Sequence, residues 1–315
     1  GGPGTLRFWY PDTFEQAHQA DCAQQPAELA FSLDGRIVAS ADSVLGARVI
    51  LTDAMSREII DLLKVESGYI NSIRHVAFSW DDSQLIAGTV QGEIVLWEAG
   101  ARKSIIKAHE TSIECIAPGP GARIVTAAAG VIRLWDMTKM QGAITPPHAH
   151  PVSALAFSSN DSHLYCGSLD SKLSIWSVRE AKCLTEFVCH RGGVASIGLS
   201  AQGELLATGG GDGRTDVEVR LWNASEGSKL EEAELNEDRA LAIAVTSDGG
   251  YLVVGALFTI HVFKLPELTS LRVIQTGEFL SASCGAVYAL ALAPNGRAFA
   301  GLENGEVLVV DIHNG

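Results

Sequence analysis

Tryptophan recurs along this chain at a near-constant interval, each time at the end of a short apolar run. The four positions are Trp97, Trp135, Trp176 and Trp222, so the intervals are 38, 41 and 46 residues. Self-similarity at such a period indicates a repeat array, in which one unit alone cannot bury its apolar face. The chain is therefore predicted to fold as a series of similar, mutually packed units.

The same position recurs beyond the four tryptophans with other residues in it. Trp9, Thr52, Phe263 and Val310 extend the register to eight slots. A second feature lies about one half-repeat upstream of seven of these slots: an apolar run followed by a turn, as in Leu29–Gly35 and Leu155–Asp161, with its weakest copy at Ile116–Gly119. Apolar runs bounded by Asp-Gly or Asn-Gly turns predict strand–turn–strand units.

A fourth and more polar strand links successive units. It is predicted at Ser56–Leu63, Lys103–Ala108, Lys182–Val188 and Leu271–Phe279. Four short strands in each unit of about 40–45 residues are typical of a β-propeller blade. Two stretches, Asp12–Ala20 and Ser225–Leu235, could also be short helices.

At this point the chain resembles the WD-repeat β-propellers. The resemblance rests on Leu134–Asp136, on the Ala-His pairs Ala108-His109 and Ala149-His150, and on the Ala-Phe-Ser runs, and it covers roughly residues 12–312. It implies an all-β, seven-bladed propeller of four-stranded antiparallel blades. It also implies a scaffold that binds a protein or peptide and performs no catalysis.

The resemblance further implies a hydrogen-bonded tetrad of His, Ser or Thr, Asp and Trp in each blade. The fourth repeat matches with His150, Cys166, Asp170 and Trp176, and the fifth with His190, Thr208, Trp222 and either Asp212 or Asp216. The third repeat keeps His109, Thr126 and Trp135 but lacks the Asp. Because the other repeats keep little of the tetrad, we expect apolar packing to hold most blades together.

In the family that the chain resembles, the top face of the ring carries most contacts. It is formed by the residues that enter each first strand and by the turn between the second and third strands. The residues at these positions are Arg74, Glu114, Leu169, Arg191, Arg239, Leu241, Tyr288 and Glu303. Tyr and Arg are enriched in interface hot spots, so this set is the predicted partner-binding surface.

The two ends of the chain are predicted to meet in one blade. The last repeat ends with its third strand at Asp311, and Asp12–Ala20 could supply the missing outer strand by pairing with Glu306–Asp311. This would remove two free sheet edges. Residues 12–315 would form the propeller. Residues 1–11, including Leu6–Tyr10, would be a leftover strand or the tail of an upstream module, or would pack outside the last blade.

Composition narrows the class of partner. The net charge of −14 disfavours binding to a nucleic-acid backbone, which needs clustered Lys and Arg. No apolar run is long enough to span a membrane. The six cysteines lie in or beside predicted strands without a Cys-x-x-Cys pair, which favours buried thiols in a reducing compartment. We expect a monomeric, cytoplasmic domain of a eukaryotic intracellular protein.

The motifs of catalysis and cofactor binding are weak. Gly209–Gly213 precedes an apolar strand and lacks the helix that a phosphate loop requires. His148 and His150 have metal-like spacing but no acidic third ligand nearby. We therefore expect no cofactor, no metal and no enzyme activity. Two alternatives remain: a sensor propeller of a multidomain NTPase-type regulator, and a propeller enzyme or small-molecule binder that uses the central channel.

Overall fold

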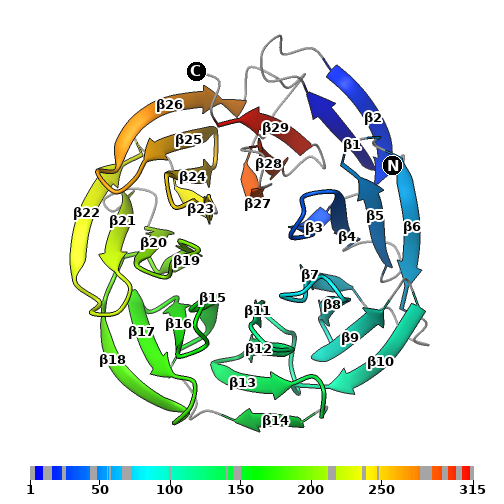
Figure 1. Cartoon of the computed structure of the whole chain (residues 1–315), viewed down its shortest axis with the longest axis horizontal. Coiled ribbons are helices and arrows are strands. Elements are labelled where there is room, and N and C mark those ends of the chain that lie inside the picture. The colour runs from blue at the N-terminus through cyan, green and yellow to red at the C-terminus, as the bar shows by residue number, and fades with distance from the viewer. Residues whose placement is uncertain are drawn as a thin grey trace.

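The fold is described from a computed structural model of the chain. It describes residues 4–9, 16–22, 26–42, 48–54, 56, 58–65, 72–98, 101–139, 141–144, 150–211, 218–235, 239–246, 248–276, 286–292, 297–302 and 307–312. Seven antiparallel sheets stand around a central channel, and in each sheet the strands follow in chain order from the channel to the rim (Figure 1). The predicted seven-bladed, all-β architecture is confirmed.

The blades share one layout, in which the first strand lies nearest the channel and the fourth lies at the rim. The first three blades are β3 (Pro26–Phe31), β4 (Ile37–Asp42), β5 (Arg48–Asp53), β6 (Ile59–Lys64); β7 (Ile73–Phe78), β8 (Gln84–Thr89), β9 (Glu93–Glu98), β10 (Ala101–Lys107); and β11 (Cys115–Gly119), β12 (Arg123–Ala128), β13 (Val131–Asp136), β14 (Gln141–Ile144). The fourth and fifth are β15 (Val152–Phe157), β16 (His163–Ser168), β17 (Lys172–Ser177), β18 (Lys182–Val188); and β19 (Val194–Leu199), β20 (Leu205–Gly210), β21 (Glu218–Asn223), β22 (Lys229–Glu234). The sixth is β23 (Ala240–Val245), β24 (Tyr251–Ala256), β25 (Thr259–Lys264), β26 (Thr269–Gln275), and the seventh is β27 (Val287–Leu292), β28 (Arg297–Leu302), β29 (Val307–Asp311).

The N-terminal segment forms a hairpin beside the seventh blade. Strand β1 (Gly4–Trp9) pairs with β2 (Gln16–Cys22), and β1 contacts β29 (Figure 1). The predicted pairing of Asp12–Ala20 with Glu306–Asp311 is therefore wrong in detail, because the 16–20 part of that segment pairs with β1 and it is β1 that lies next to β29. The helical alternatives for these residues and for Ser225–Leu235 also give way to strands, β2 and β22.

The recurring aromatic slot joins each blade to the blade before it. Each slot residue belongs to a buried cluster with side chains of the preceding blade: Trp97 with Val49, Trp135 with Ile94, Trp176 with Val125, Trp222 with Leu173, Phe263 with Val219, and Val310 with Val253. All six slot residues are at most 6% exposed. The periodicity of the sequence thus marks the contacts between blades.

A second recurring position joins each blade to the blade after it. It lies in the second strand and holds only glycine or alanine: Ala41, Gly88, Ala127, Gly167, Gly209, Gly255 and Gly301. A Cβ atom added at Gly255 would lie 2.4 Å from Val287 Cγ1 of the next blade, and one at Gly167 would lie 2.5 Å from Val194 Cγ1. Packing this close leaves no room for a side chain at these glycines, and the other blades have at most the methyl group of alanine at this position.

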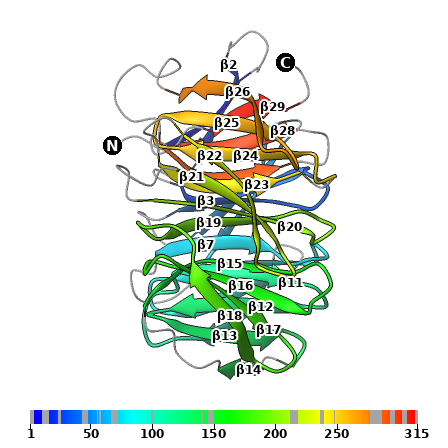
Figure 2. The ribbon, with the colours of Figure 1, turned by 90° about the vertical axis from the view of Figure 1, so that its left-hand side faces the viewer.

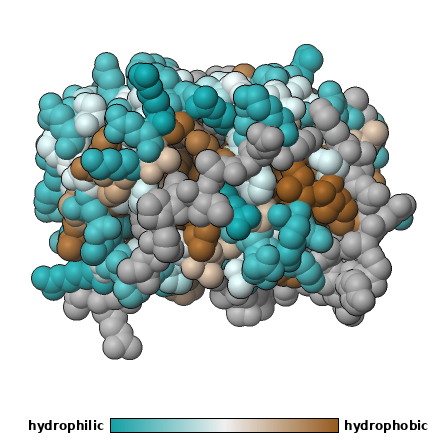
Figure 3. Space-filling model, turned by 90° about the horizontal axis from the view of Figure 1, so that it is seen from below, coloured by the Kyte–Doolittle hydropathy of each residue, from teal (hydrophilic) through white to brown (hydrophobic). Residues whose placement is uncertain are grey.

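The ring has two faces and a rim (Figure 2). We call the face at which the first strands begin the top face, and the face at which they end the bottom face. Fourth strands cover the rim, where hydrophobic side chains appear among hydrophilic ones (Figure 3). Exposed apolar residues of these strands include Ile60, Leu184, Val188 and Leu271. The described residues contain no helix that could cross a membrane.

Candidate partner-binding surface at the channel mouth

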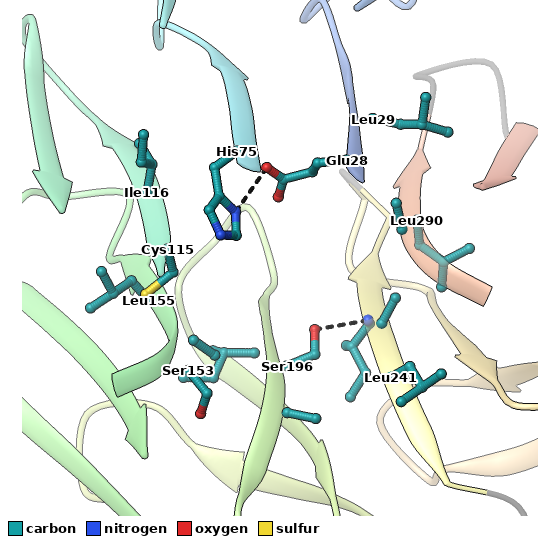
Figure 4. Close-up of a pocket in the computed structure, with 16 residues that line it drawn as sticks. Glu28, Leu29, His75, Cys115, Ile116, Ser153, Leu155, Ser196, Leu241 and Leu290 are labelled. Carbon is teal, nitrogen blue, oxygen red and sulfur yellow. Dashed lines mark hydrogen bonds and ion pairs between the residues drawn. The ribbon is translucent and has the colours of Figure 1, made fainter. Parts of the chain in front are cut away.

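The upper half of the channel holds a cavity of about 270 Å³. All seven first strands line it, and they contribute polar side chains on one part of the wall and aliphatic side chains on the rest. The residues labelled in Figure 4 are Glu28, Leu29, His75, Cys115, Ile116, Ser153, Leu155, Ser196, Leu241 and Leu290.

Polar side chains in this wall bridge neighbouring first strands. Glu28 Oε2 of β3 accepts a hydrogen bond from the backbone N of Val76 at 2.8 Å and lies 3.0 Å from His75 Nδ1, both on β7 (Figure 4). Ser196 Oγ of β19 accepts a hydrogen bond from Ile243 N of β23 at 3.0 Å (Figure 4). Ser153 Oγ of β15 donates to the carbonyl of Val194 on β19. These contacts fix the spacing of the strands around the channel.

A β-bulge near the start of the first strands creates the channel mouth. In the second blade Ile73 pairs with Thr89 and His75 pairs with Gly88, so Arg74 is left out of the ladder. Ser153, Ala195, Leu241 and Tyr288 are left out in the same way in the fourth to seventh blades. Because a bulge bends its strand and redirects a side chain, one architecture presents a different residue from each blade. We call these residues the mouth positions.

The second and third blades place opposite charges together at the mouth. Burial raises the pKa of the Glu114 carboxyl, while a hydrogen bond from the Ala129 backbone and the nearby charges of Arg74 and His75 oppose this rise. Arg74 itself is exposed. The structure therefore brings together Arg74 and Glu114, two of the predicted partner-binding residues.

The fourth and fifth blades place a second pair of predicted residues side by side. Leu169 stands at the tip of the turn between β16 and β17 and is 55% exposed. Ser171 Oγ of the same turn donates to the carbonyl of Arg191 at 2.7 Å, and Gly193 approaches the Leu169 backbone closely. An exposed aliphatic side chain and the exposed Arg191 thus share one part of the top face.

The one thiol in the cavity wall is held in its protonated form. Burial raises the pKa of Cys115 well above its ordinary value, and its Sγ lies 3.5 Å from the carbonyl of Val152, to which it donates. A cysteine nucleophile needs a lowered pKa and access to solvent. Among the described residues no group of three or more His, Cys, Asp or Glu side chains is arranged to hold a metal ion.

Comparisons with known proteins agree with this architecture. The family model described as "WD domain, G-beta repeat" matches residues 142–177 and 181–215. A chain in the crystal structure of the mitotic checkpoint complex superposes with a TM-score of 0.77 at 20% identity, covering 89% of this chain and 87% of that one. The chain is thus similar to the WD-repeat β-propellers in its fold and in two of its repeats.

Curated relatives are longer and distant in sequence. Autophagy-related protein 16 of Arabidopsis thaliana is 24% identical over 236 residues, which are 70% of this chain and 45% of the relative. Apoptotic protease-activating factor 1 of Rattus norvegicus is 27% identical over 168 residues, which are 52% of this chain and 13% of the relative. The chain therefore spans less than half the length of these two relatives.

Two blades of the propeller contain the hydrogen bonds that the WD-repeat resemblance implies. In the third blade Thr126 Oγ1 lies 2.8 Å from His109 Nε2 and accepts a hydrogen bond from Trp135 Nε1 at 2.9 Å. In the fifth blade Thr208 Oγ1 lies 3.0 Å from His190 Nε2 and accepts from Trp222 Nε1 at 2.9 Å. In both blades a buried threonine links the segment before the first strand to the slot tryptophan. Asp216 lies outside the described residues.

The fourth blade differs from the predicted tetrad. His150 is exposed, Trp176 Nε1 donates to Ser174 Oγ at 2.8 Å rather than to Cys166, and Asp170 accepts a hydrogen bond from Ser168. His109 and His190 precede the buried residues Ile113 and Val194 by four positions, whereas His150 precedes the buried Val152 by only two. His150 thus stands too close to its strand, and Ser174 takes over the role of acceptor.

The remaining predicted partner-binding residues are placed in part. Leu241 lines the cavity, and Arg239 directly precedes β23. Tyr288 is a mouth position by its register, but its side chain lies outside the described residues, as does the whole of Glu303.

Phe258 is a top-face residue outside the predicted set. It is 57% exposed in the turn between β24 and β25, which is equivalent to the turn that holds Leu169 in the fourth blade. It lies between two apolar runs, so its position suggested core rather than surface.

Proposed function

We propose that this propeller is a non-catalytic scaffold that binds a protein or peptide segment on its top face, within a larger protein or complex. The observation that carries the proposal is the set of mouth positions, which are equivalent in backbone geometry and differ in side chain from blade to blade. A rigid ring that presents Arg74, Glu114, Leu169, Arg191 and Leu241 around one opening suits an extended partner with several contacts.

Known relatives support a role in assembly. One of them is a p21-activated protein kinase-interacting protein 1-like protein of Danio rerio, 27% identical over 149 residues. The structurally similar chain comes from a mitotic checkpoint complex. Burial raises the pKa of Cys115, which makes this thiol of the cavity wall a poor nucleophile. A cytoplasmic location accords with buried thiols such as those of Cys115 and Cys166, which are not in disulfides.

Affinity capture with quantitative mass spectrometry tests the proposal. The variant Arg74→Glu/Leu169→Ser/Arg191→Glu reverses two charges and removes one apolar side chain on the top face. The matched control Lys182→Glu/Leu184→Ser/Lys229→Glu makes the same chemical changes on the rim. We expect the top-face variant to lose at least ten-fold of the captured partner while the rim variant retains it. Equal capture by both variants would rule out this face.

A second candidate function uses the cavity itself. Glu28 and His75 form the one described ion pair in its wall, and a carboxylate beside an imidazole in a half-buried site could bind a small polar ligand. Metal analysis of the purified chain and a panel of hydrolase substrates distinguish this candidate from the scaffold. Turnover that disappears in Glu28→Gln and in His75→Ala would favour it.

A third possibility, a sensor propeller in a multidomain NTPase-type regulator, agrees with the small share of apoptotic protease-activating factor 1 that the chain covers. In that case residues 1–11 would be the tail of an upstream module. The sequence of the full-length gene upstream of residue 1 distinguishes this possibility from the first.

A further inference from the structure

The bottom face carries a separate apolar feature at the lower end of the channel. A cavity of about 280 Å³ is lined by Trp80, Pro118, Phe157, Ser159, Leu199 and their neighbours, from the second to the fifth blade. Trp80 is 46% exposed, whereas the slot tryptophans Trp97, Trp135, Trp176 and Trp222 are all at most 6% exposed. An exposed indole at the entrance of an apolar cavity is unusual for a turn residue and suits a binding site.

A second exposed apolar residue stands at the equivalent turn position of the first blade. Leu33 is 70% exposed, and its backbone N donates to Asp82 Oδ2 of the Trp80 turn at 2.6 Å. This hydrogen bond holds the two turns together. The fourth and fifth blades have Ser159 and Ala201 at the same position, so the architecture of the turn does not require a large apolar side chain there.

The surroundings of these two residues are acidic. The described turns between first and second strands hold six carboxylates and one guanidinium group: Asp34, Asp81, Asp82, Asp161, Glu204 and Asp248 against Arg36, while Arg123 begins β12 directly after such a turn. Arg123 is paired with Asp161. Hydrogen bonds from Ser32 and Ser79 lower the pKa of Asp34 and of Asp81, so both remain charged near neutral pH. On the top face, in contrast, the residues at or just before the start of the first strands include Arg74, Arg191 and Arg239.

We propose that the bottom face is a docking site for a basic peptide segment that carries an apolar anchor residue. The anchor would enter the lower cavity beside Trp80 while Lys or Arg side chains contact Asp34, Asp81 and Asp248. An indole can also attract a cation through its ring face, which adds to the attraction by the carboxylates. This site is independent of the partner on the top face.

The chain itself supplies conservative substitutions for a test. Asn160 occupies the turn position of Asp34, Asp81 and Asp248, and its Oδ1 accepts from Ser158 Oγ at 2.8 Å as Asp81 Oδ1 accepts from Ser79 Oγ at 2.8 Å. The variant Asp34→Asn/Asp81→Asn/Asp248→Asn therefore removes charge and keeps the turn. Leu33→Ala/Trp80→Ser likewise introduces residues that the fifth and fourth blades already carry at this position.

The measurement is fluorescence anisotropy with a labelled decapeptide of Lys and Arg around one central Phe. An acidic peptide with the same Phe and a basic peptide with Gly in its place are the controls. We expect the basic Phe peptide to bind at least ten-fold more tightly than either control. Each bottom-face variant should lower its affinity at least ten-fold, and the Asn variant should also reduce the dependence on salt.

A matched rim variant, Asp61→Asn/Glu231→Gln/Glu234→Gln, distinguishes binding at the bottom face from nonspecific attraction of the basic peptide to a negatively charged protein. These three carboxylates are exposed on β6 and β22. Their substitution removes three negative charges, as the triple Asn variant of the bottom face does. Thermal melts verify that each variant is folded. Equal loss in the rim and bottom-face variants, unchanged affinity in the bottom-face variants, or equal binding of all three peptides would each overturn the proposal.

Discussion

Two buried threonines of this propeller differ in the hydrogen bonding of their hydroxyl groups. Thr126 contacts both His109 and Trp135 through its hydroxyl. Thr52 occupies the aromatic slot of the first blade, is fully buried, and its Oγ1 has no hydrogen-bond partner among the described residues. A buried hydroxyl is favourable only when it is paired, so the two positions should respond differently to the same substitution.

Thr→Val, which keeps the shape of the side chain, tests this difference. We expect Thr52→Val to raise the free energy of unfolding by about 1 kcal/mol, because it removes an unpaired buried hydroxyl. Thr126→Val should lower it by about 2 kcal/mol, because two buried partners lose their hydrogen bond. Urea denaturation of both variants gives the comparison, and a loss of stability in Thr52→Val would contradict the account.

The pH dependence of stability should show the burial of His109. Burial, assisted by the charge of Arg133, lowers the pKa of His109 to about 4 from an ordinary value of 6.5. Between these two values the unfolded chain binds a proton that the folded chain does not bind. The stability contributed by the neutral imidazole is therefore fully present above pH 6.5 and is lost as the pH falls to about 4, by about 3 kcal/mol in total.

His109→Gln provides the control for this titration, because Gln cannot take up a proton. Urea denaturation at several pH values should show a shallower decline of stability in the variant than in the wild type between pH 6.5 and pH 4. Parallel declines would mean that His109 does not contribute to the pH dependence.

Single residues also show what the sequence could and could not predict. The family resemblance implied that His109, Thr126 and Trp135 interact, and hydrogen-bond contacts join these three side chains. His150 was misplaced because an Ala-His pair looks alike whether it stands two or four residues before the next buried residue of its blade, Val152 or Ile113. The exposure of Phe258 and Trp80 could not be predicted, since an aromatic residue beside an apolar run suggests core.

At the scale of strands, the contact between blades depends on small residues in the second strands. Gly255 of β24 faces Val287 of β27, whose side chain is fully buried. Gly255→Ala should lower the free energy of unfolding by about 1–3 kcal/mol, because a well-packed interface cannot take an added methyl group. Urea denaturation of the single variants and of Gly255→Ala/Val287→Ala measures the coupling.

Val287→Ala removes the Cγ1 atom at 2.4 Å from the added methyl and leaves Cβ at 2.8 Å, so it relieves part of the crowding. Ala240 already occupies the equivalent position in the sixth blade. We therefore expect the double variant to lose less stability than the sum of the two single variants. Strict additivity would show that the two side chains do not compete for the same space.

Most strands could be predicted from apolar runs and turns, since each strand end coincides with a change from apolar to turn residues. The β18 bounds, Lys182–Val188, match the prediction. The bulges that form the mouth positions had no sequence signal that was recognised, because a bulge changes the register of hydrogen bonds without changing the composition of the strand. The glycine and alanine residues of the second strands are visible in the sequence. The sequence alone does not show that they pack against the next blade.

At the scale of the whole molecule, the ring closes between the seventh and first blades. Strand β27 contacts β3, and a Cβ atom at Gly301 would lie 2.7 Å from Leu29 Cδ1. The seventh blade has three strands of its own, and the β1–β2 hairpin lies beside β29. We propose that the hairpin protects the edge of this blade, since a free edge strand destabilises a sheet protein.

Removal of residues 1–22 tests the role of the hairpin. We expect the melting temperature to fall by several degrees, because the deletion exposes the edge of β29 and removes the contacts of β1. Removal of residues 1–3 alone, which leaves both strands in place, should have little effect. An unchanged melt after the longer deletion would show that the ring closes without the N-terminal segment.

Hydrogen–deuterium exchange of the chain, alone and with a partner obtained by affinity capture, tests the scaffold proposal most directly. A partner on the top face should slow exchange in peptides that contain Arg74, Glu114, Leu169, Arg191 and Leu241, and should leave the outer strands β18 and β22 unchanged. Protection restricted to the rim, or spread evenly over the ring, would contradict a docking surface at the channel mouth.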